Sequence, residues 1–424
     1  MGSYTLVCLE CGLKMEDRLQ NWCPLGHDAL LRSEYRERKL KVKNFPGMWK
    51  FLEWLPCTSP LPTEGEALTY KSEGLARELG LKDLYISFSG YWPERGAKLM
   101  SCSFKELEAS SVLARTKERS RGIMVVASAG NTARAFALLS EKTSVQVMAV
   151  VPRPYLSRIW VPGEKPSHFL LLGAEGGYRE AIQWVERISR LEGTIAEGGA
   201  RNVGRRDGIG TLLLSAVLEM GRLPDHYFQA VGSGVGALAV LEASLRLLAD
   251  GGFGKRLPRL HLSQNLPFAP MFHAWKEGRN RILPELDLPS PEEAEKEMYA
   301  TILSNPSPPY SVKGGVYEAL RMSGGRMYGI SNKEALEAWK WVREEEGIDL
   351  DPAASVAVAS LVQAVEEGEV KEEEMVLLNL SGGGYERIRE DFSLSPIEPS
   401  LILNKDTSLE EVKEVMKGWC SLAR

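Results

Sequence analysis

Two hydrophobic patterns alternate along the middle of the chain. Short uninterrupted apolar runs predict buried strands, and longer stretches with apolar residues three or four positions apart predict helices. Such an alternation is typical of βαβ units, in which parallel strands form a sheet and helices cover its faces. We expect strands at residues 123–127, 145–151, 169–173, 194–196 and 227–231, and helices at residues 106–119, 133–139, 178–191, 211–220 and 237–248.

The pattern is looser on both sides of this region. Towards the C-terminus, we expect strands at 260–263 and 375–380, a loop and helix segment at 285–325, and helices at 332–346, at 353–366 and from 409 onward. Towards the N-terminus, we expect a basic surface arm at 39–50, a proline-bearing linker at 56–62, a helix at 74–81 and a strand at 83–87. The chain of 424 residues is long enough for two α/β domains.

Charge and composition exclude several classes of function. The formal net charge of -5 and the pI of about 5.8 favour neither a nucleic-acid partner nor an anionic membrane. The sequence has no apolar run long enough to span a membrane, and its N-terminus lacks the basic and apolar regions of a secretory signal. Six cysteines in this length do not make a disulfide scaffold, so we expect a protein of the reducing cytoplasm.

Thiol and imidazole side chains gather in the first 30 residues. Cys8 and Cys11 form a CxxC pair, and Cys23 and His27 follow with the spacing C-x2-C-x11-C-x3-H. Thiolates and imidazole are the ligands that structural zinc prefers, four to a closed site. The spacing predicts either a small ribbon with about one zinc per chain or a degenerate ribbon that has lost its metal. A redox role is disfavoured because the CxxC pair lies outside a βαβ pattern.

One lysine stands at a junction between a loop and a helix. Lys105 follows Ser103 and Phe104, and the helix expected at 106–119 begins directly after it. A lysine at such a place can project into a cleft, where its amine can form a Schiff base with an aldehyde cofactor. Most lysines in this local context are solvated helix starts, so the interpretation depends on three loops elsewhere in the chain.

Three small, polar loops follow three of the expected strands. In the first, Gly232, Ser233, Gly234, Val235 and Gly236 precede a helix, so that backbone N–H groups and the positive helix end can bind an anion. The G-x-G-x-G spacing fits a phosphate monoester better than a dinucleotide, which needs G-x-G-x-x-G, and no Gly-Lys-Ser/Thr of a P-loop follows. A tight turn without a ligand is the alternative for this loop alone.

The other two loops carry hydroxyl and amide groups. Ser128 and Thr132 flank a segment that can hold a carboxylate at a helix N-terminus, and Asn131 can donate to a phenolic oxygen. Ser381 ends a strand and can face a ring nitrogen. A plain helix cap and an ordinary turn are the respective alternatives. Together with Lys105 and the glycine loop, these groups match the aldehyde, phosphate, ring oxygen and ring nitrogen of pyridoxal 5'-phosphate.

The chain resembles the tryptophan-synthase-β (fold type II) family of pyridoxal-phosphate enzymes, and within it the threonine-synthase-like branch. The shared motifs are Ser103-Phe104-Lys105, Ser-x-Gly-Asn-Thr at 128–132, Ala-Glu-Gly-Gly-Tyr at 174–178 and Asp-Pro-Ala-Ala-Ser at 351–355. The resemblance implies an α/β fold of two parallel-sheet, helix-flanked domains with the cofactor in the cleft between them. It also implies the following division: residues 1–30 as a zinc-ribbon-like segment, 31–122 with 221–424 as the large domain, and 123–220 as a smaller, mobile domain.

Two motifs depart from the threonine-synthase pattern. The usual Asp-Arg after the lysine is replaced by Glu106-Leu107, and the lysine of Asn-Pro-x-Arg-x-x-Gly-Gln-Lys-Thr is replaced by Gly210. The arginine that meets the substrate phosphate in that family falls on Arg205. These segments and residues 88–95 instead resemble the cysteate-forming branch of methanogens, whose members make L-cysteate from O-phospho-L-serine and sulfite for coenzyme M.

This resemblance implies roles for particular residues. Lys105 is expected to hold the cofactor and to take the Cα proton, Ser128 and Thr132 to bind the substrate carboxylate, and Arg205 to meet the phosphate. The resemblance also implies small-molecule substrates and a homo-oligomer, either a dimer or a trimer. Candidates for the second anion, each expected to be a surface charge, are Lys98, Arg134 and Arg206.

Other activities remain open at this point. Threonine synthase acting on O-phosphohomoserine and a phosphoserine-dependent cysteine synthase are the alternative enzymes. A non-catalytic relative that keeps the fold as an anion-binding protein is a further class, although it would be expected to have lost Lys105, which is present.

Overall fold

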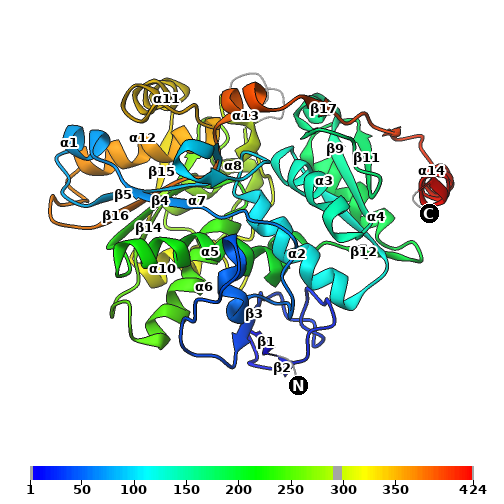
Figure 1. Cartoon of the computed structure of the whole chain (residues 1–424), viewed down its shortest axis with the longest axis horizontal. Coiled ribbons are helices and arrows are strands. Elements are labelled where there is room, and N and C mark those ends of the chain that lie inside the picture. The colour runs from blue at the N-terminus through cyan, green and yellow to red at the C-terminus, as the bar shows by residue number, and fades with distance from the viewer. Residues whose placement is uncertain (1–2, 290–297, 423–424) are drawn as a thin grey trace.

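Two parallel sheets dominate the computed structural model, which describes residues 3–289 and 298–422 (Figure 1). The larger sheet has six strands in the order β15-β14-β13-β16-β5-β4, with β4 antiparallel at one edge and the other pairs parallel. Its strands are β4 (Leu68–Lys71), β5 (Leu84–Phe88), β13 (His226–Ala230), β14 (Arg259–Asn265), β15 (Arg326–Ile330) and β16 (Val376–Leu380).

The smaller sheet is parallel throughout. Its five strands have the order β12-β8-β9-β11-β18, namely β8 (Ile123–Ala127), β9 (Val147–Pro152), β11 (Phe169–Ala174), β12 (Thr194–Ala196) and β18 (Leu401–Leu403). Strand β18 pairs with β11, although the sequence assigned residues 401–403 to the larger domain. The domain boundaries, and the mobility of the smaller domain, stay predictions.

Three short antiparallel groups complete the sheets. Strands β1 (Tyr4–Cys8), β2 (Lys14–Met15) and β3 (Leu31–Tyr35) form the N-terminal ribbon. The other two groups are the pair β6 (Tyr91–Trp92) and β7 (Ala97–Lys98), and the pair β10 (Trp160–Pro162) and β17 (Leu394–Pro396).

Helices cover both faces of the larger sheet, with α11 and α12 on one side and α5, α6 and α10 on the other (Figure 1). Helix α2 lies between the two sheets and packs on both α3 and α5. The helices are α1 (Gly74–Leu79), α2 (Lys105–Arg119), α3 (Asn131–Thr143), α4 (Tyr178–Ile188), α5 (Val203–Met220), α6 (Val235–Asp250), α7 (Pro270–Lys276), α8 (Pro284–Asp287), α10 (Val316–Ser323), α11 (Asn332–Glu346), α12 (Pro352–Glu366), α13 (Tyr385–Asp391) and α14 (Leu409–Leu422). Across the described parts of the chain, every helix falls short of the length and apolar character that crossing a membrane requires.

The predicted α/β class with parallel sheets is confirmed. Strands such as β9, β13 and β16 are buried at every residue, because helices cover both sheet faces and neither face needs polar side chains. Mostly apolar runs therefore identified these strands correctly, although Gln229 interrupts the run in β13 and Asn379 the run in β16. Within the loop and helix segment expected at 285–325, residues 290–297 lie outside the described residues.

Helix α5 begins eight residues before the predicted helix at 211–220, at Val203. The Asn202 side chain caps it by accepting a hydrogen bond from the Gly204 N–H at 2.9 Å. Glycines weaken helices, which made this turn look like a loop in the sequence. Here Gly208 lets α5 approach α2 closely, since a Cβ at this position would lie 2.4 Å from the Leu107 carbonyl oxygen. Tertiary packing outweighs the low helix propensity.

The predicted surface arm at 39–50 and linker at 56–62 are wrong in part. Residues Gly47–Trp54 form a 3-10 helix, and Trp49, Phe51 and Trp54 are buried in the main hydrophobic core. Cys57 and Leu61 in the predicted linker are buried as well. Prolines and basic residues are typical of a surface segment, but the aromatic residues between them are buried here. Their burial stabilises the chain between the ribbon and the larger sheet.

Candidate active site

One cavity collects residues from all five segments that the sequence singled out for cofactor or substrate binding. It lies where β8, β13 and β16 end, because the loops that follow parallel strands meet at the same edge of the structure. Its lining includes Lys105, Ser128, Asn131, Thr132, Arg205, Gly232, Ser233, Gly234, Val235, Gly236 and Ser381. The structure brings these residues together, and their individual roles stay predictions.

Other residues line the cavity without having been predicted. They include Phe104, Tyr178, Gln229, Ala230, Val231, Ala353 and residues 302–305. Tyr178 belongs to the Ala-Glu-Gly-Gly-Tyr motif, so a signal for it existed in the sequence. The segment 302–305 carries no motif, and only the tertiary fold brings it to the cavity.

Lys105 is the first residue of α2, and its side chain lines the cavity. The amine lies 2.8 Å from a carboxylate oxygen of Glu108, one helical turn further along. Just before the lysine, Ser103 forms a β-bridge with Gly382, and the Phe104 N–H donates to the Ser381 carbonyl oxygen at 3.0 Å. This backbone pairing holds Lys105 and Ser381 on adjacent segments of one cavity wall.

A buried chain of four charges begins at Lys105. One oxygen of Glu108 accepts from the Lys105 amine, and the other lies 2.9 Å from Nη1 of Arg205. The Nε and Nη2 groups of Arg205 donate to the two oxygens of Glu197 at 2.6 and 2.5 Å. Two cations and two carboxylates alternate, so the chain of charges is neutral as a whole.

This arrangement favours the charged forms of Glu108 and Arg205. Burial alone raises the pKa of Glu108, but the charges of Arg205 and Lys105 and the hydrogen bonds from Lys105 and Thr132 lower that pKa below the usual carboxyl range. Burial alone lowers the pKa of Arg205, yet the carboxylates of Glu108 and Glu197 raise it above its ordinary value. The arginine is therefore a permanent cation whose charge two carboxylates share.

The glycine loop presents bare backbone to the cavity. Helix α6 begins at Val235, and Gly234 takes the left-handed conformation with φ of 78°. In the described part of the chain, the backbone N–H groups of Ser233 and Gly234 donate no hydrogen bond. A Cβ on Gly236 would lie 2.4 Å from Nε2 of Gln229, so a side chain does not fit there. Free N–H groups at a helix N-terminus suit a phosphate.

The sequence left two interpretations open for the loop at 128–132, a carboxylate site and a plain helix cap, and the structure is compatible with both. The Ser128 hydroxyl accepts from the N–H groups of Gly130 and Ala133 at 3.0 and 2.9 Å, so it caps helix α3. The Thr132 hydroxyl donates to Glu108 at 3.1 Å. Both hydroxyls serve the protein itself, which leaves the backbone N–H groups at the start of α3 as the donors available to a carboxylate.

These groups fit pyridoxal phosphate. The free N–H groups of the glycine loop supply an anion site, the Lys105 amine is a nucleophile for the aldehyde, and Ser381 lies on the same wall. Asn131 also lines the cavity, although its amide donates to Asp351 at 3.2 Å and its carbonyl oxygen accepts from Arg134 at 2.8 Å. One N–H of the Asn131 amide remains for a ring oxygen.

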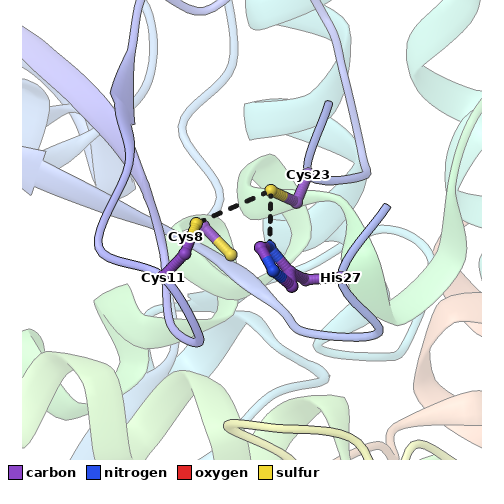
Figure 2. Close-up of side chains that lie close together, drawn as sticks. All are labelled: Cys8, Cys11, Cys23 and His27. Atoms are coloured by element: carbon purple, nitrogen blue, oxygen red, sulfur yellow. Dashed lines mark hydrogen bonds between the residues drawn. The ribbon is translucent and has the colours of Figure 1, made fainter. Parts of the chain in front are cut away.

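The N-terminal cluster is a candidate metal centre, separate from this cavity (Figure 2). Its four ligand atoms, from Cys8, Cys11, Cys23 and His27, lie within 4.8 Å of one another. The sulfurs of Cys11 and Cys23 are 3.9 Å apart, and Cys23 lies 3.4 Å from Nδ1 of His27. Two thiolates bound to tetrahedral zinc at about 2.3 Å would lie about 3.8 Å apart, so the spacing fits that metal.

Two of the three candidates for a second anion are buried, which corrects the expectation of surface charges. Arg206 is fully buried and pairs with Glu242 at 3.1 Å. Arg134 is also buried, and it donates to the Ser101 carbonyl oxygen and to the Tyr385 hydroxyl. Lys98 is exposed as expected. The helix position of Arg134 could be read from the sequence, but that of Arg206 could not, because α5 begins before the predicted helix. The partners of both arginines come from distant segments.

Comparison with known proteins matches most of the chain to one protein family. A family model described as pyridoxal-phosphate dependent enzyme matches residues 62–382. The chain is 49% identical over 416 residues to a cysteate synthase of Methanosarcina barkeri, covering 97% of this chain and 100% of the relative. It is 50% identical over 420 residues to a cysteate synthase of Methanocella arvoryzae, covering 98% of this chain and 100% of the relative.

Solved structures share the fold at low sequence identity. Maize serine racemase has a TM-score of 0.57 at 14% identity, covering 77% of this chain and 91% of that one. Threonine deaminase isoform 2 of Solanum lycopersicum has a TM-score of 0.55 at 18% identity, covering 76% of this chain and 82% of that one. At these identities the likeness concerns the fold alone.

Proposed function

The chain belongs to the family of pyridoxal-phosphate-dependent enzymes, and from this premise we propose that it is a cysteate synthase. Its reaction converts O-phospho-L-serine and sulfite into L-cysteate and phosphate. The observation that carries the proposal is the full-length identity of 49% and 50% to two cysteate synthases. The C–O bond at Cβ breaks, and the sulfur lone pair of sulfite forms the new C–S bond, so no external oxidant is required.

Lys105 is the residue that holds the cofactor and moves the proton. When bound, pyridoxal phosphate supplies an electron-withdrawing ring that makes the Cα–H bond of the amino acid acidic. The freed amine of Lys105 takes the Cα proton and returns it later. Glu108 lies 2.8 Å from this amine. Its negative charge stabilises the lysine amine when the amine carries the proton.

The loops orient the substrate around Lys105. The start of α3, at 128–132, binds the substrate carboxylate through backbone N–H groups, with Ser128 holding the loop in shape. Arg205 faces the phosphate with the N–H groups that Glu197 and Glu108 leave free. Ser381 lines the cavity and would offer a neutral hydroxyl to the ring nitrogen of the cofactor, which would suit a β-elimination because the leaving group carries the charge away at once.

Three features complete the proposal. The cluster of Cys8, Cys11, Cys23 and His27 holds one structural zinc ion, which the ligand spacing supports. Residues 123–220 move as a smaller domain when substrate binds. The chain assembles in the cytoplasm as a dimer or a trimer, which light scattering can measure.

A substrate comparison tests the function. Purified protein loaded with the cofactor is incubated with O-phospho-L-serine plus sulfite, and separately with O-phosphohomoserine, while phosphate release and the products are measured. We expect cysteate in the first mixture and no threonine in the second; the reverse pattern would assign threonine synthase. Sulfide in place of sulfite measures cysteine synthase activity in the same assay. The Lys105→Ala variant should lose the visible cofactor absorbance and about 10²–10⁴-fold or more of the rate.

A further inference from the structure

A second cavity adjoins the cofactor cavity behind the loop at 128–132. The two cavities share Asn131 and Ile302 in their linings, and the second is further lined by Arg134, Arg158 and Arg389. Arg158 packs directly against the loop, since a Cβ on Gly130 would lie 2.9 Å from its Cδ. The side of the loop away from the glycine nest therefore faces a space with three guanidinium groups.

Positive charge is in excess in this second cavity. Asp351 is its one lining carboxylate, and it already accepts from the Tyr385 hydroxyl at 2.8 Å and from the Ala353 N–H at 2.9 Å. Within residues 3–289 and 298–422, neither Arg158 nor Arg389 forms an ion pair. Burial, together with the positive charge of Arg134, lowers the pKa of Arg158 below its usual value. Such a site attracts an anion.

Free donors accompany the charge. Arg158 donates to the Ala129 carbonyl oxygen at 3.1 Å and to the Thr301 hydroxyl at 2.6 Å, which uses two of the five N–H groups of a guanidinium. Arg389 is exposed, and its guanidinium makes no hydrogen bond among the described residues. A guanidinium fork matches the oxygens of a small oxyanion in two parallel hydrogen bonds.

The cofactor cavity lacks such an excess. There, Glu108 and Glu197 balance the charges of Lys105 and Arg205. A small dianion such as sulfite therefore meets an excess of positive charge in the second cavity, beyond Asn131.

We propose that the cavity lined by Arg134, Arg158 and Arg389 binds sulfite and delivers it to the Cβ of the substrate. This inference rests on the proposed function. The released phosphate has the same oxyanion chemistry, and the experiment separates the two ions. Arg158 and Arg389 supply the hydrogen bonds, and Arg134, whose donors are mostly used within the protein, supplies charge.

The test uses the cofactor-loaded protein and the variants Arg389→Met and Arg158→Met. Arg387→Met is the matched control, because Arg387 lies on the same helix but pairs with Glu94 and Asp391. Steady-state rates give the KM for each substrate. The KM for sulfite should rise about 10-fold in Arg389→Met and up to about 100-fold in Arg158→Met, while the KM for phosphoserine stays within about 2-fold. Should Arg158→Met fail to fold, Arg158→Lys and the exposed Arg389 still provide the test.

The outcomes are distinct. A KM for sulfite that changes no more than in Arg387→Met would overturn the inference. Inhibition of the reaction by added phosphate is measured in the same variants. If Arg389→Met and Arg158→Met lose this inhibition while the KM for sulfite is unchanged, the cavity binds phosphate and the sulfite site is refuted. Calorimetric titration of sulfite without phosphoserine tests the oxyanion site separately from the proposed enzyme activity. If sulfite binding depends on Arg389 but the protein makes no cysteate, the oxyanion site is supported and the proposed function is refuted.

Discussion

Glu108 is the centre of the charge chain that begins at Lys105, and its replacement by Gln tests that chain. The side chain is fully buried and accepts from Lys105 at 2.8 Å, from Thr132 at 3.1 Å and from Arg205 at 2.9 Å. Gln keeps the shape of Glu but removes the negative charge. Lys105 and Arg205 would then have only one carboxylate left in the chain of charges, that of Glu197, which pairs with Arg205.

The loss of stability expected in Glu108→Gln follows from this unbalanced positive charge. Removing one partner of a buried ion pair costs about 3–5 kcal/mol, because a charge remains in a poorly solvated place. The unfolding entropy of a chain of 424 residues is about 0.9 kcal/mol/K, from about 2.1 cal/mol/K per residue. Dividing the first quantity by the second predicts a fall in the melting temperature of about 3–6 °C.

Thermal unfolding followed by circular dichroism measures this fall. Glu118→Gln is the control on the same helix, since the Glu118 carboxylate lies near the surface and accepts from the Thr58 N–H at 2.6 Å. Glu118→Gln should lower the melting temperature by only about 1 °C. The double variant Glu108→Gln with Arg205→Met restores the charge balance. It should therefore lose less stability than the sum of the losses in the two single variants. A fall of less than about 1 °C in Glu108→Gln would refute the charge chain.

Further predictions concern a buried carboxyl, the substrate phosphate and the metal. Burial raises the pKa of Glu106 from 4.5 to about 7, so the stability that its protonated form contributes is complete below pH 4.5 and is lost as pH rises through 7. Melting temperatures at pH 5 and pH 8 should therefore differ less in Glu106→Gln than in the unaltered protein. Arg205→Ala should raise the KM for phosphoserine about 10-fold or more, well beyond its effect on the KM for sulfite, and equal effects on both would contradict a phosphate contact. Elemental analysis should find about one zinc per chain, and Cys11→Ser should abolish it and lower the melting temperature; full stability without metal would indicate a degenerate ribbon.

Much of the site could be predicted because its chemistry follows strand ends. The small polar loops at 128–132 and 232–236 come directly after apolar runs, and parallel strands bring such loops to one edge. Local sequence therefore identified which groups would meet, although not what else they would contact. Ser128, for example, caps α3 with its hydroxyl rather than leaving it free for a ligand.

The sequence by itself predicted the alternation of strands and helices in the middle of the chain, the parallel sheets, and the loops and the lysine that meet at the cavity, because each depends on periodicity or on residues adjacent in the chain. Strands β4, β15 and β18 of the two main sheets were not predicted. Only the tertiary structure decided the start of α5, the burial of Trp49 and the partners of Arg134, Arg205 and Arg206. Those features depend on contacts between segments that lie far apart in the chain. The charge of a residue can be read from its letter, whereas the neutralisation of that charge depends on which carboxylate the fold brings to it.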